Sequence, residues 1–395
     1  MKVIMRINSI EFHDNARNWR LEKTTFDDFT LLVGASGVGK TQILDAIKTV
    51  KKIALGEKHL HCSWNIECST LKHGDYRWEG KIEDDFVYEE VWKIDNKTSY
   101  VIAERDGEKG IFNNVPISVK ISKEISLLEF MRAEDAIRLL RQEFYFIHDT
   151  FISSLYGSPI RYLEFLPEKE IDTMFSDVTL EADLIEKYTT GLHGYDFVGK
   201  IITTLKRFPD IAQKIISGFI NIFPQVESVA LDRRVNTIRD QTIKLYATAN
   251  IIQSLERPAL TLVMKEKGIN EPIPLEYWSS GMQRVFFDLC EIFLSPSGTV
   301  LVIDEFENSL GVNCIGSLTE EILNSERNLQ FIITSHHPYI INNVDTQYWK
   351  IVTRNGGVVR THTAEELKLG KSKHQAFTEL INRVEFRTGQ EEELV

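Results

Sequence analysis

The stretch Gly34-Ala35-Ser36-Gly37-Val38-Gly39-Lys40-Thr41 decides the fold of this chain. An apolar run at residues 30–33 precedes it, and apolar residues at helical spacing follow it over 43–54. A glycine-rich turn between a buried strand and a helix is the context in which this pattern binds nucleotide phosphates. Glycines let backbone N–H groups point inward, while Lys40 is suited to the β- and γ-phosphates and the Thr41 hydroxyl to Mg²⁺. The stretch therefore predicts a site for ATP and Mg²⁺.

Two acids end a second apolar run, Val300-Leu301-Val302-Ile303-Asp304-Glu305. Many buried strands end in an acid, so the pair alone is weak evidence. Downstream of a phosphate loop, it predicts that Asp304 holds Mg²⁺ through water and that Glu305 polarises the attacking water. The chain is then expected to be an ATPase that converts ATP and water to ADP and phosphate.

The segment Trp278-Ser279-Ser280-Gly281-Met282-Gln283-Arg284 lies one expected helix before these acids. A small hydroxyl and a glycine at a helix start make a good anion site, although the same residues also occur as a simple helix cap. With this segment the chain resembles ATP-binding-cassette (ABC) ATPases, in the variant of the SMC and RecF-like branch. The resemblance implies that Ser279, Ser280 and Gly281 contact the γ-phosphate held by an opposite subunit, which requires a homodimer or a higher homo-oligomer.

The same resemblance gives a role to a histidine in Thr334-Ser335-His336-His337-Pro338, at the end of the next apolar run. A histidine at this place in the family contacts and senses the γ-phosphate. His336 is the first choice for that role and His337 the second.

Two further positions are compared with the family pattern. Many relatives carry an aspartate at the end of the loop after the acids, where this chain has Gly311. This departure concerns communication between two sites and leaves the hydrolytic acids in place. Gln142 is the candidate for a metal-sensing glutamine, and an ordinary surface glutamine is the favoured alternative.

These patterns predict an α/β fold: a P-loop NTPase head of the ABC type, with a mixed sheet and flanking helices, split by a mixed α/β and largely helical insertion. The expected parts are 1–54 with the phosphate loop, a β-rich arm at 55–120, a mainly helical insertion at 121–225, the rest of the head at 226–360 and a C-terminal tail at 361–395. Helices are expected over 125–140, 180–188 and 211–223, and strands over 144–147, 226–231, 243–247 and 260–264. The sequence has no sustained heptad repeat, so a coiled coil is not expected.

Bulk properties narrow the choice of partners. The formal net charge of -12 over 395 residues argues against a surface coated with Lys and Arg for phosphate backbones. No apolar stretch is long enough for a membrane span, and four cysteines give no disulfide framework, so a cytoplasmic protein without a membrane partner is expected. A zinc site from Cys62, Cys68 and the histidines near them is disfavoured, because the spacing matches no common zinc module.

The expected insertion and three sequence segments indicate a narrower group of ATPases. SSGMQR (279–284), IDEFENSLG (303–311) and ITSHHPYIIN (333–342) resemble compact AAA-family ATPases of bacterial anti-phage systems, such as the OLD family and the ATPases of the Septu, PARIS and retron-linked systems. The resemblance implies a sensor or regulatory ATPase that controls a separate effector, a nuclease or toxin, because the residues after His336 are too few for a typical fused nuclease domain. Nucleic acid is a further candidate partner.

Two alternatives are weighed against this hypothesis. One is a RecF-like DNA-repair ATPase that binds duplex DNA, which the net charge disfavours. The other is the ATP-driving subunit of a transporter, which the long insertion and the form of the 278–284 segment disfavour.

Overall fold

The computed structural model of the chain describes residues 5–57, 61–70, 74–83, 86–95, 98–122, 125–149, 168–186, 193–235, 258–308, 310–323, 328–370 and 372–389. The chain forms two compact units. The first comprises Met1–His148, Ser297–Asn308 and Leu323–Val395, and the second Asp149–Pro296 and Ser309–Ile322. Each unit therefore joins segments that are far apart in the sequence. The five-part division expected from the sequence stays a prediction.

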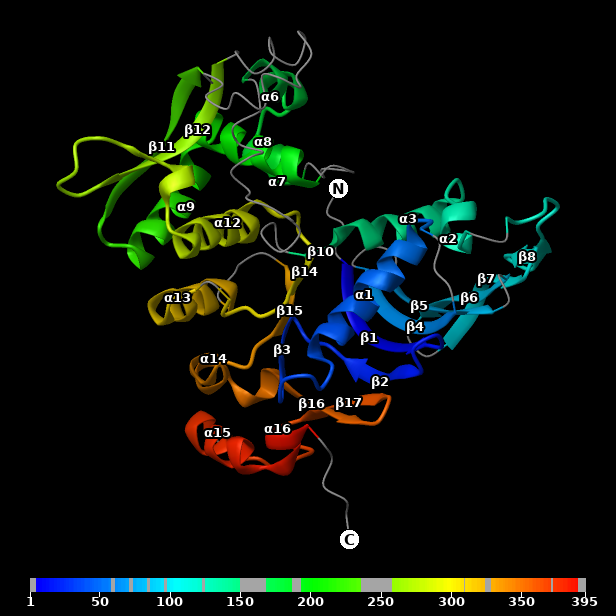
Figure 1. The fold of residues 1–395 in the computed structure, drawn as a ribbon. Coiled ribbons are helices and arrows are strands. Elements are labelled where there is room, and N and C mark those ends of the chain that lie inside the picture. Colours follow the sequence, from blue (N-terminus) through cyan, green and yellow to red (C-terminus); the bar gives the residue numbers. More distant parts are fainter. Residues whose placement is uncertain are drawn as a thin grey trace, which may run out of the picture. The chain divides into compact units, whose positions relative to one another are not determined.

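One sheet organises the first unit, and among the described residues it has 14 strands in the order β10-β14-β15-β3-β16-β17-β2-β1-β4-β5-β6-β7-β8-β9 (Figure 1). The strands are β1 (Met5–Asp14), β2 (Trp19–Thr25), β3 (Phe29–Val33), β4 (Cys62–Thr70), β5 (Gly74–Glu83), β6 (Phe86–Asp95), β7 (Thr98–Asp106), β8 (Lys109–Phe112), β9 (Val115–Pro116), β10 (Ile147–Asp149), β14 (Val300–Ile303), β15 (Gln330–Thr334), β16 (Trp349–Asn355) and β17 (Val358–Thr363).

The parallel part of this sheet carries the sequence motifs. Strands β14, β15, β3 and β16 are neighbours and run parallel to one another. Every residue of β3, β14 and β15 is buried. This agrees with the continuous apolar runs in the sequence, which are typical of parallel strands covered on both faces of the sheet. Because parallel strands end at the same edge, the segments after β3, β14 and β15 meet there.

The antiparallel part, β2, β1 and β4 to β9, packs one face against helices α1 (Lys40–Ala54), α2 (Leu127–Phe130) and α3 (Asp135–Glu143). Alternate residues of β4 are buried, and the Trp64 and Trp78 rings meet edge-on at 5.0 Å. Phe144 extends this aromatic cluster, 5.5 Å from Trp78. This packing fixes α1, and therefore the end of the phosphate loop, on the sheet.

Two expected elements of this region differ from the structure. The helix expected over 125–140 is two helices, because α2 ends at Phe130 and α3 begins at Asp135. The strand expected over 144–147 was wrong for its first three residues, which form the 3₁₀ turn η1 (Phe144–Phe146). The turn continues directly from α3 and buries Phe144 completely, so three consecutive aromatic residues gave a misleading strand pattern.

The remaining helices of the first unit follow the later strands. They are α14 (Pro338–Asn343), η3 (Thr346–Tyr348), α15 (Lys373–Asn382) and α16 (Val384–Thr388). The region expected as a C-terminal tail thus contains the end of β17, α15 and α16, and residues beyond 389 lie outside the described part. The Arg354 N–H of β16 donates to the Gly389 carbonyl at 2.6 Å, so the chain after α16 is attached to the sheet.

The second unit contains a smaller sheet, in the order β11-β12-β13, and a group of helices (Figure 1). Its elements are α6 (Glu168–Met174), α7 (Glu181–Glu186), α8 (His193–Arg207), α9 (Pro209–Ile222), β11 (Val226–Val235), β12 (Pro258–Glu266), β13 (Ile273–Pro274), η2 (Leu275–Tyr277), α12 (Ser280–Leu294) and α13 (Val312–Leu323). Phe219 of α9 stacks on Trp278 at 5.4 Å and meets Phe286 of α12 edge-on at 5.5 Å. The strand expected over 243–247 lies outside the described residues.

Among the described residues, no helix combines the length and the apolar character that a membrane span requires.

Candidate functional site

The turn between β3 and α1 has the backbone that a phosphate loop needs. Gly34, Gly37 and Gly39 have positive φ angles of 154°, 82° and 110°, which favour glycine. A Cβ on Gly34 would lie 2.7 Å from the Val352 carbonyl oxygen of β16, so this position is also sterically closed to larger residues. α1 begins directly after Gly39. The loop and the N-terminus of α1 together form a cradle that fits an anion such as a phosphate group.

Lys40 lies folded over this loop. Its Nζ donates to the carbonyl oxygens of Gly34 at 2.8 Å and Ala35 at 2.9 Å. Burial lowers the pKa of Lys40, and the attraction of Glu307, Asp304 and Glu305 offsets part of that effect. The cation is thus attached to the loop by two carbonyls and attracted by three carboxylates.

Asp304 is hydrogen-bonded to two threonines from different segments. The register pairs Ile303 of β14 with Ile333 of β15, which places Asp304 beside Thr334. The Thr334 hydroxyl donates to Asp304 Oδ1 at 2.5 Å, and the Thr41 hydroxyl donates to the same oxygen at 3.2 Å. The loop and the acidic strand end therefore form one site. Hydroxyl and carboxylate oxygens are also the ligands that Mg²⁺ prefers, so Thr41 and Asp304 fit the metal expected there.

Glu305 is positioned by an unusual backbone turn. Its φ is 45°, a left-handed conformation that non-glycine residues seldom adopt, and its side chain is exposed. The Glu305 N–H donates to the Thr334 hydroxyl at 2.8 Å, and the Phe306 N–H donates to the Thr334 carbonyl at 3.1 Å. Because Phe306 is buried, this turn is fixed while the Glu305 carboxylate faces solvent. Strained backbone of this kind is typical of functional sites.

Thr334 has no role in the sequence-based prediction, although it contacts both acids. The sequence did contain a signal for it, because Thr334 is a hydroxyl residue at the end of the next apolar run after the acids. Its importance depends on β14 and β15 being neighbours in a defined register, which the pattern of either run alone does not reveal.

The two histidines differ in their contacts. His337 caps α14, because its Nδ1 accepts from the Tyr339 N–H at 3.2 Å. The His336 side chain is 55% exposed and its Nδ1 lies 2.8 Å from Glu307 Oε1. His336 is therefore the histidine whose ring remains accessible at the edge of the sheet that holds the acids and the phosphate loop.

Ser279, Ser280 and Gly281 belong to the second unit, at the start of α12. Ser279 is the helix cap, and its hydroxyl oxygen accepts from the Met282 N–H at 3.2 Å. Gln283 Nε2 donates to the carbonyls of Leu275 and Trp278, both at 3.0 Å, which holds the turn before the helix. The two serines are exposed. This helix start can bind an anion, and its contact with a γ-phosphate stays a prediction.

Gly311 and Gln142 receive no functional assignment from the structure. Gly311 lies just before α13, where its carbonyl accepts from the Cys314 N–H at 2.9 Å. Gln142 is exposed in the last turn of α3. The roles considered for these two positions stay predictions.

The zinc alternative gains no support. Cys62 and Cys68 are both buried on the core face of β4, and burial raises the pKa of the Cys62 thiol to about 12. Among the described residues no group of three or more His, Cys, Asp or Glu is arranged to hold a metal ion. His59 and His73 lie outside those residues.

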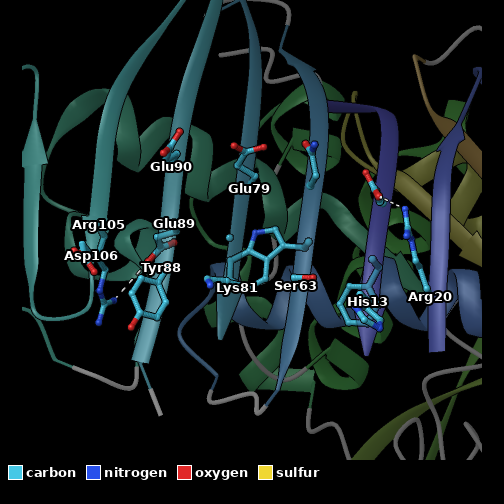
Figure 2. Close-up of a pocket in the computed structure, with 15 residues that line it drawn as sticks. His13, Arg20, Ser63, Glu79, Lys81, Tyr88, Glu89, Glu90, Arg105 and Asp106 are labelled. Carbon is cyan, nitrogen blue, oxygen red and sulfur yellow. Dashed lines mark hydrogen bonds and ion pairs between the residues drawn. The ribbon is translucent and has the colours of Figure 1, made fainter. Parts of the chain in front are cut away.

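A separate hollow of about 650 Å³ lies on the open face of the antiparallel strands (Figure 2). Its lining includes Glu79, Lys81, Tyr88 and Glu90, which project from β5 and β6. Several of its charges already have partners within the chain, as Lys81 has in Glu83 at 2.7 Å. None of the residues of the phosphate loop or the acidic strand end lines it.

Comparisons with known proteins show the family and the fold of the chain. The family described as "AAA domain, putative AbiEii toxin, Type IV TA system" matches residues 134–342, more than half of the chain, including Asp304, Glu305 and His336. No curated protein matches the sequence. A structure of the Smc head bound to the C-terminal winged-helix domain of ScpA is similar, with 16% identity, a TM-score of 0.51 and coverage of 91% of this chain and 99% of that one.

A second similar structure is an Smc head with an extended coiled coil, bound to the C-terminal domain of ScpA from Pyrococcus furiosus. It has 14% identity, a TM-score of 0.50 and coverage of 92% of this chain and 98% of that one. At such identities the likeness concerns the fold. The fold is that of an ABC-type P-loop head, as the sequence predicts.

The C-terminal end of the described chain packs against the phosphate loop. Gly389 follows α16 with a left-handed φ of 74°, and a Cβ added to it would clash with Val38 Cγ1. The same Cβ would lie 3.7 Å from Ala35 Cβ. The loop is thus supported by a residue that is remote in sequence.

Gly389→Ala should therefore weaken binding of a non-hydrolysable ATP analogue roughly tenfold, since overpacking costs about 1–3 kcal/mol and about 1.4 kcal/mol is a factor of ten. Isothermal titration calorimetry measures the affinity. Gly356→Ala is the matched control, because Gly356 also has a positive φ, 60°, but open space around its Cβ. Equal affinities for both variants would show that the Gly389 contact does not position the loop.

Proposed function

The chain belongs to the family of AAA domains that matches residues 134–342, and on this premise we propose that it binds ATP with Mg²⁺ and hydrolyses it. The observation that carries the proposal is the convergence on Asp304 Oδ1 of hydroxyls from Thr41, beside the phosphate loop, and from Thr334. This convergence joins the phosphate loop, residues 34–41, to the end of β14, where the two acids lie.

The first task of the site is to hold the triphosphate. Backbone N–H groups of residues 34–41 bind the phosphate oxygens, and the N-terminus of α1 adds a favourable dipole. Lys40 exchanges its present carbonyl partners, Gly34 and Ala35, for phosphate oxygens of higher negative charge. Thr41 and Asp304 hold Mg²⁺, which when bound neutralises charge on the β- and γ-phosphates.

The second task is to activate water. Glu305 projects from a fixed turn into solvent, so its carboxylate can accept a hydrogen bond from a water molecule near the γ-phosphate. The water oxygen attacks the γ-phosphorus, the bond to the β-phosphate oxygen breaks, and ADP leaves. Glu305 orients the water and takes up its proton, which is then released with the phosphate.

Assembly of two or more copies completes the proposed site. Ser279, Ser280 and Gly281 open α12 with exposed serines and a helix dipole, and contact the γ-phosphate held by another copy. The turn before them is held by Gln283, which supports the proposal of an anion site formed before nucleotide binds. Such an arrangement couples ATP binding to the closure of a homodimer or a higher homo-oligomer.

The biological role that fits best is the sensor or regulatory ATPase of a prokaryotic defence system with a separate effector. The matched family is described by a toxin and a toxin–antitoxin system, which supports a role in controlled toxicity. The net charge of -12 favours this role over a RecF-like protein dedicated to duplex DNA. In the cell we expect a cytoplasmic protein.

Two substitutions test hydrolysis. Lys40→Ala should abolish nucleotide binding, because it removes the main positive charge of the loop. Glu305→Gln should bind ATP normally and lower kcat by roughly 100-fold or more, the usual contribution of a general base. Phosphate release and calorimetry separate these effects. If Glu305→Gln turned over at the wild-type rate, Glu305 would not be the base.

A third substitution tests assembly. In the Glu305→Gln background, ATP should increase the molecular mass measured by light scattering, because hydrolysis no longer reopens the assembly. Adding Ser280→Arg should prevent this increase and leave ATP binding by each subunit intact, since Ser280 lies in the second unit. An ATP-dependent assembly that tolerates Ser280→Arg would rule out the proposed contact.

The effector hypothesis is tested with the purified protein and the product of the neighbouring gene. We expect the partner, or duplex DNA, to change ATP turnover severalfold, with Lys40→Ala as the inactive control. Turnover that is constant under all these conditions would count against the regulatory role. Stimulation by DNA alone, with strong salt dependence, would favour the DNA-repair alternative.

A further inference from the structure

We propose that Glu307 is a positioning residue that holds the His336 ring for contact with the γ-phosphate. This inference rests on the proposed ATPase function and deepens it, because it concerns an acid outside the pair that binds metal and water. Glu307 lies three residues after Asp304, and His336 lies two residues after Thr334. The proposed contact therefore joins the segments that follow β14 and β15.

One carboxylate oxygen makes both contacts. Glu307 Oε1 accepts from the His336 backbone N–H at 2.8 Å, and His336 Nδ1 lies 2.8 Å from the same oxygen. Together they fix the backbone and the ring of the same residue. The ring is 55% exposed, and Glu307 is the residue that we expect to set its orientation.

The contact also sets which ring nitrogen can act on a ligand. A carboxylate oxygen only accepts, so the Nδ1 facing Glu307 must carry the proton. Nε2 is then the nitrogen left for an outside ligand. It donates to a phosphate oxygen when it carries a proton. Glu307 would thus set the orientation in which the ring presents Nε2 to a γ-phosphate.

Glu307 is unlike an ordinary surface partner of a histidine. Its side chain is only 9% exposed, and its Oε2 is buried without a hydrogen-bond partner among the residues that the structure describes. Burying an unsatisfied carboxylate oxygen is unfavourable, so such groups in folded proteins call for an explanation. Its charge also acts on Lys40, more strongly than those of Asp304 and Glu305. Glu307 therefore belongs electrostatically to the phosphate site.

A role in local folding alone would account for the same two contacts, and a double-mutant cycle separates the two explanations. If Glu307 acts through His336, its removal has no further effect once the ring is gone. If Glu307 instead supports the fold or Lys40 independently of His336, the rate of the double variant falls by the product of the two single losses.

The experiment compares wild type, Glu307→Ala, His336→Ala and the double variant for kcat and KM of ATP. We expect each single variant to lower kcat roughly 10- to 100-fold, as for other groups that orient a functional residue, with KM changed less than about threefold. The double variant should be no slower than His336→Ala. Glu307→Gln, which keeps an acceptor oxygen, should recover part of the rate. Glu22→Ala is the matched control, since it removes a carboxylate paired with Arg360 at 2.8 Å on other strands.

Multiplicative losses in the double variant, or a rise in KM without a fall in kcat, would overturn the proposal. Unchanged melting temperatures are required of every variant, and Glu307→Gln serves if Glu307→Ala does not fold. Failure of the ATPase proposal can be told apart from failure of the Glu307 proposal. In the first case the wild-type protein would show no ATP turnover above that of Lys40→Ala.

Discussion

The structure depends on the order β14-β15-β3 in the middle of the large sheet. This order brings Thr41, near the start of the chain, within hydrogen-bond distance of Asp304, although 263 residues separate them. Thr334, on the strand between, donates to the same carboxylate oxygen and receives the Glu305 N–H. Two threonine hydroxyls thus assemble the site from three segments, and the remaining elements keep these strand ends in place.

The local signals in the sequence were sufficient to predict the strands and the helix that carry the candidate site. A complete phosphate-loop pattern between an apolar run and an amphipathic helix leaves few alternatives, and β3 and α1 lie where it predicts. The same applies to β14, β15 and α12, which are long or uniformly apolar. Signals were weaker around 125–149, where aromatic residues fit a strand and a buried turn equally well.

Contacts between distant segments were beyond the sequence. Thr334 and Glu307 stand in quoted motifs, but their partners follow from strand order and register, which single-strand patterns do not contain. The packing of Gly389 against Val38 is an extreme case, because the two residues come from opposite ends of the chain. The likeness to Smc heads concerns the fold. It does not tell which side chains of this chain make these contacts.

We propose above all that the edge of the sheet formed by residues 34–41 and Asp304 is a site for Mg·ATP. Calorimetric titration of the wild-type protein with a non-hydrolysable ATP analogue, with and without Mg²⁺, tests it most directly. We expect saturable binding of one nucleotide per chain that is tighter with Mg²⁺ and is weakened by loss of the Asp304 carboxylate. No binding at millimolar analogue, or binding indifferent to both Mg²⁺ and Asp304, would contradict it.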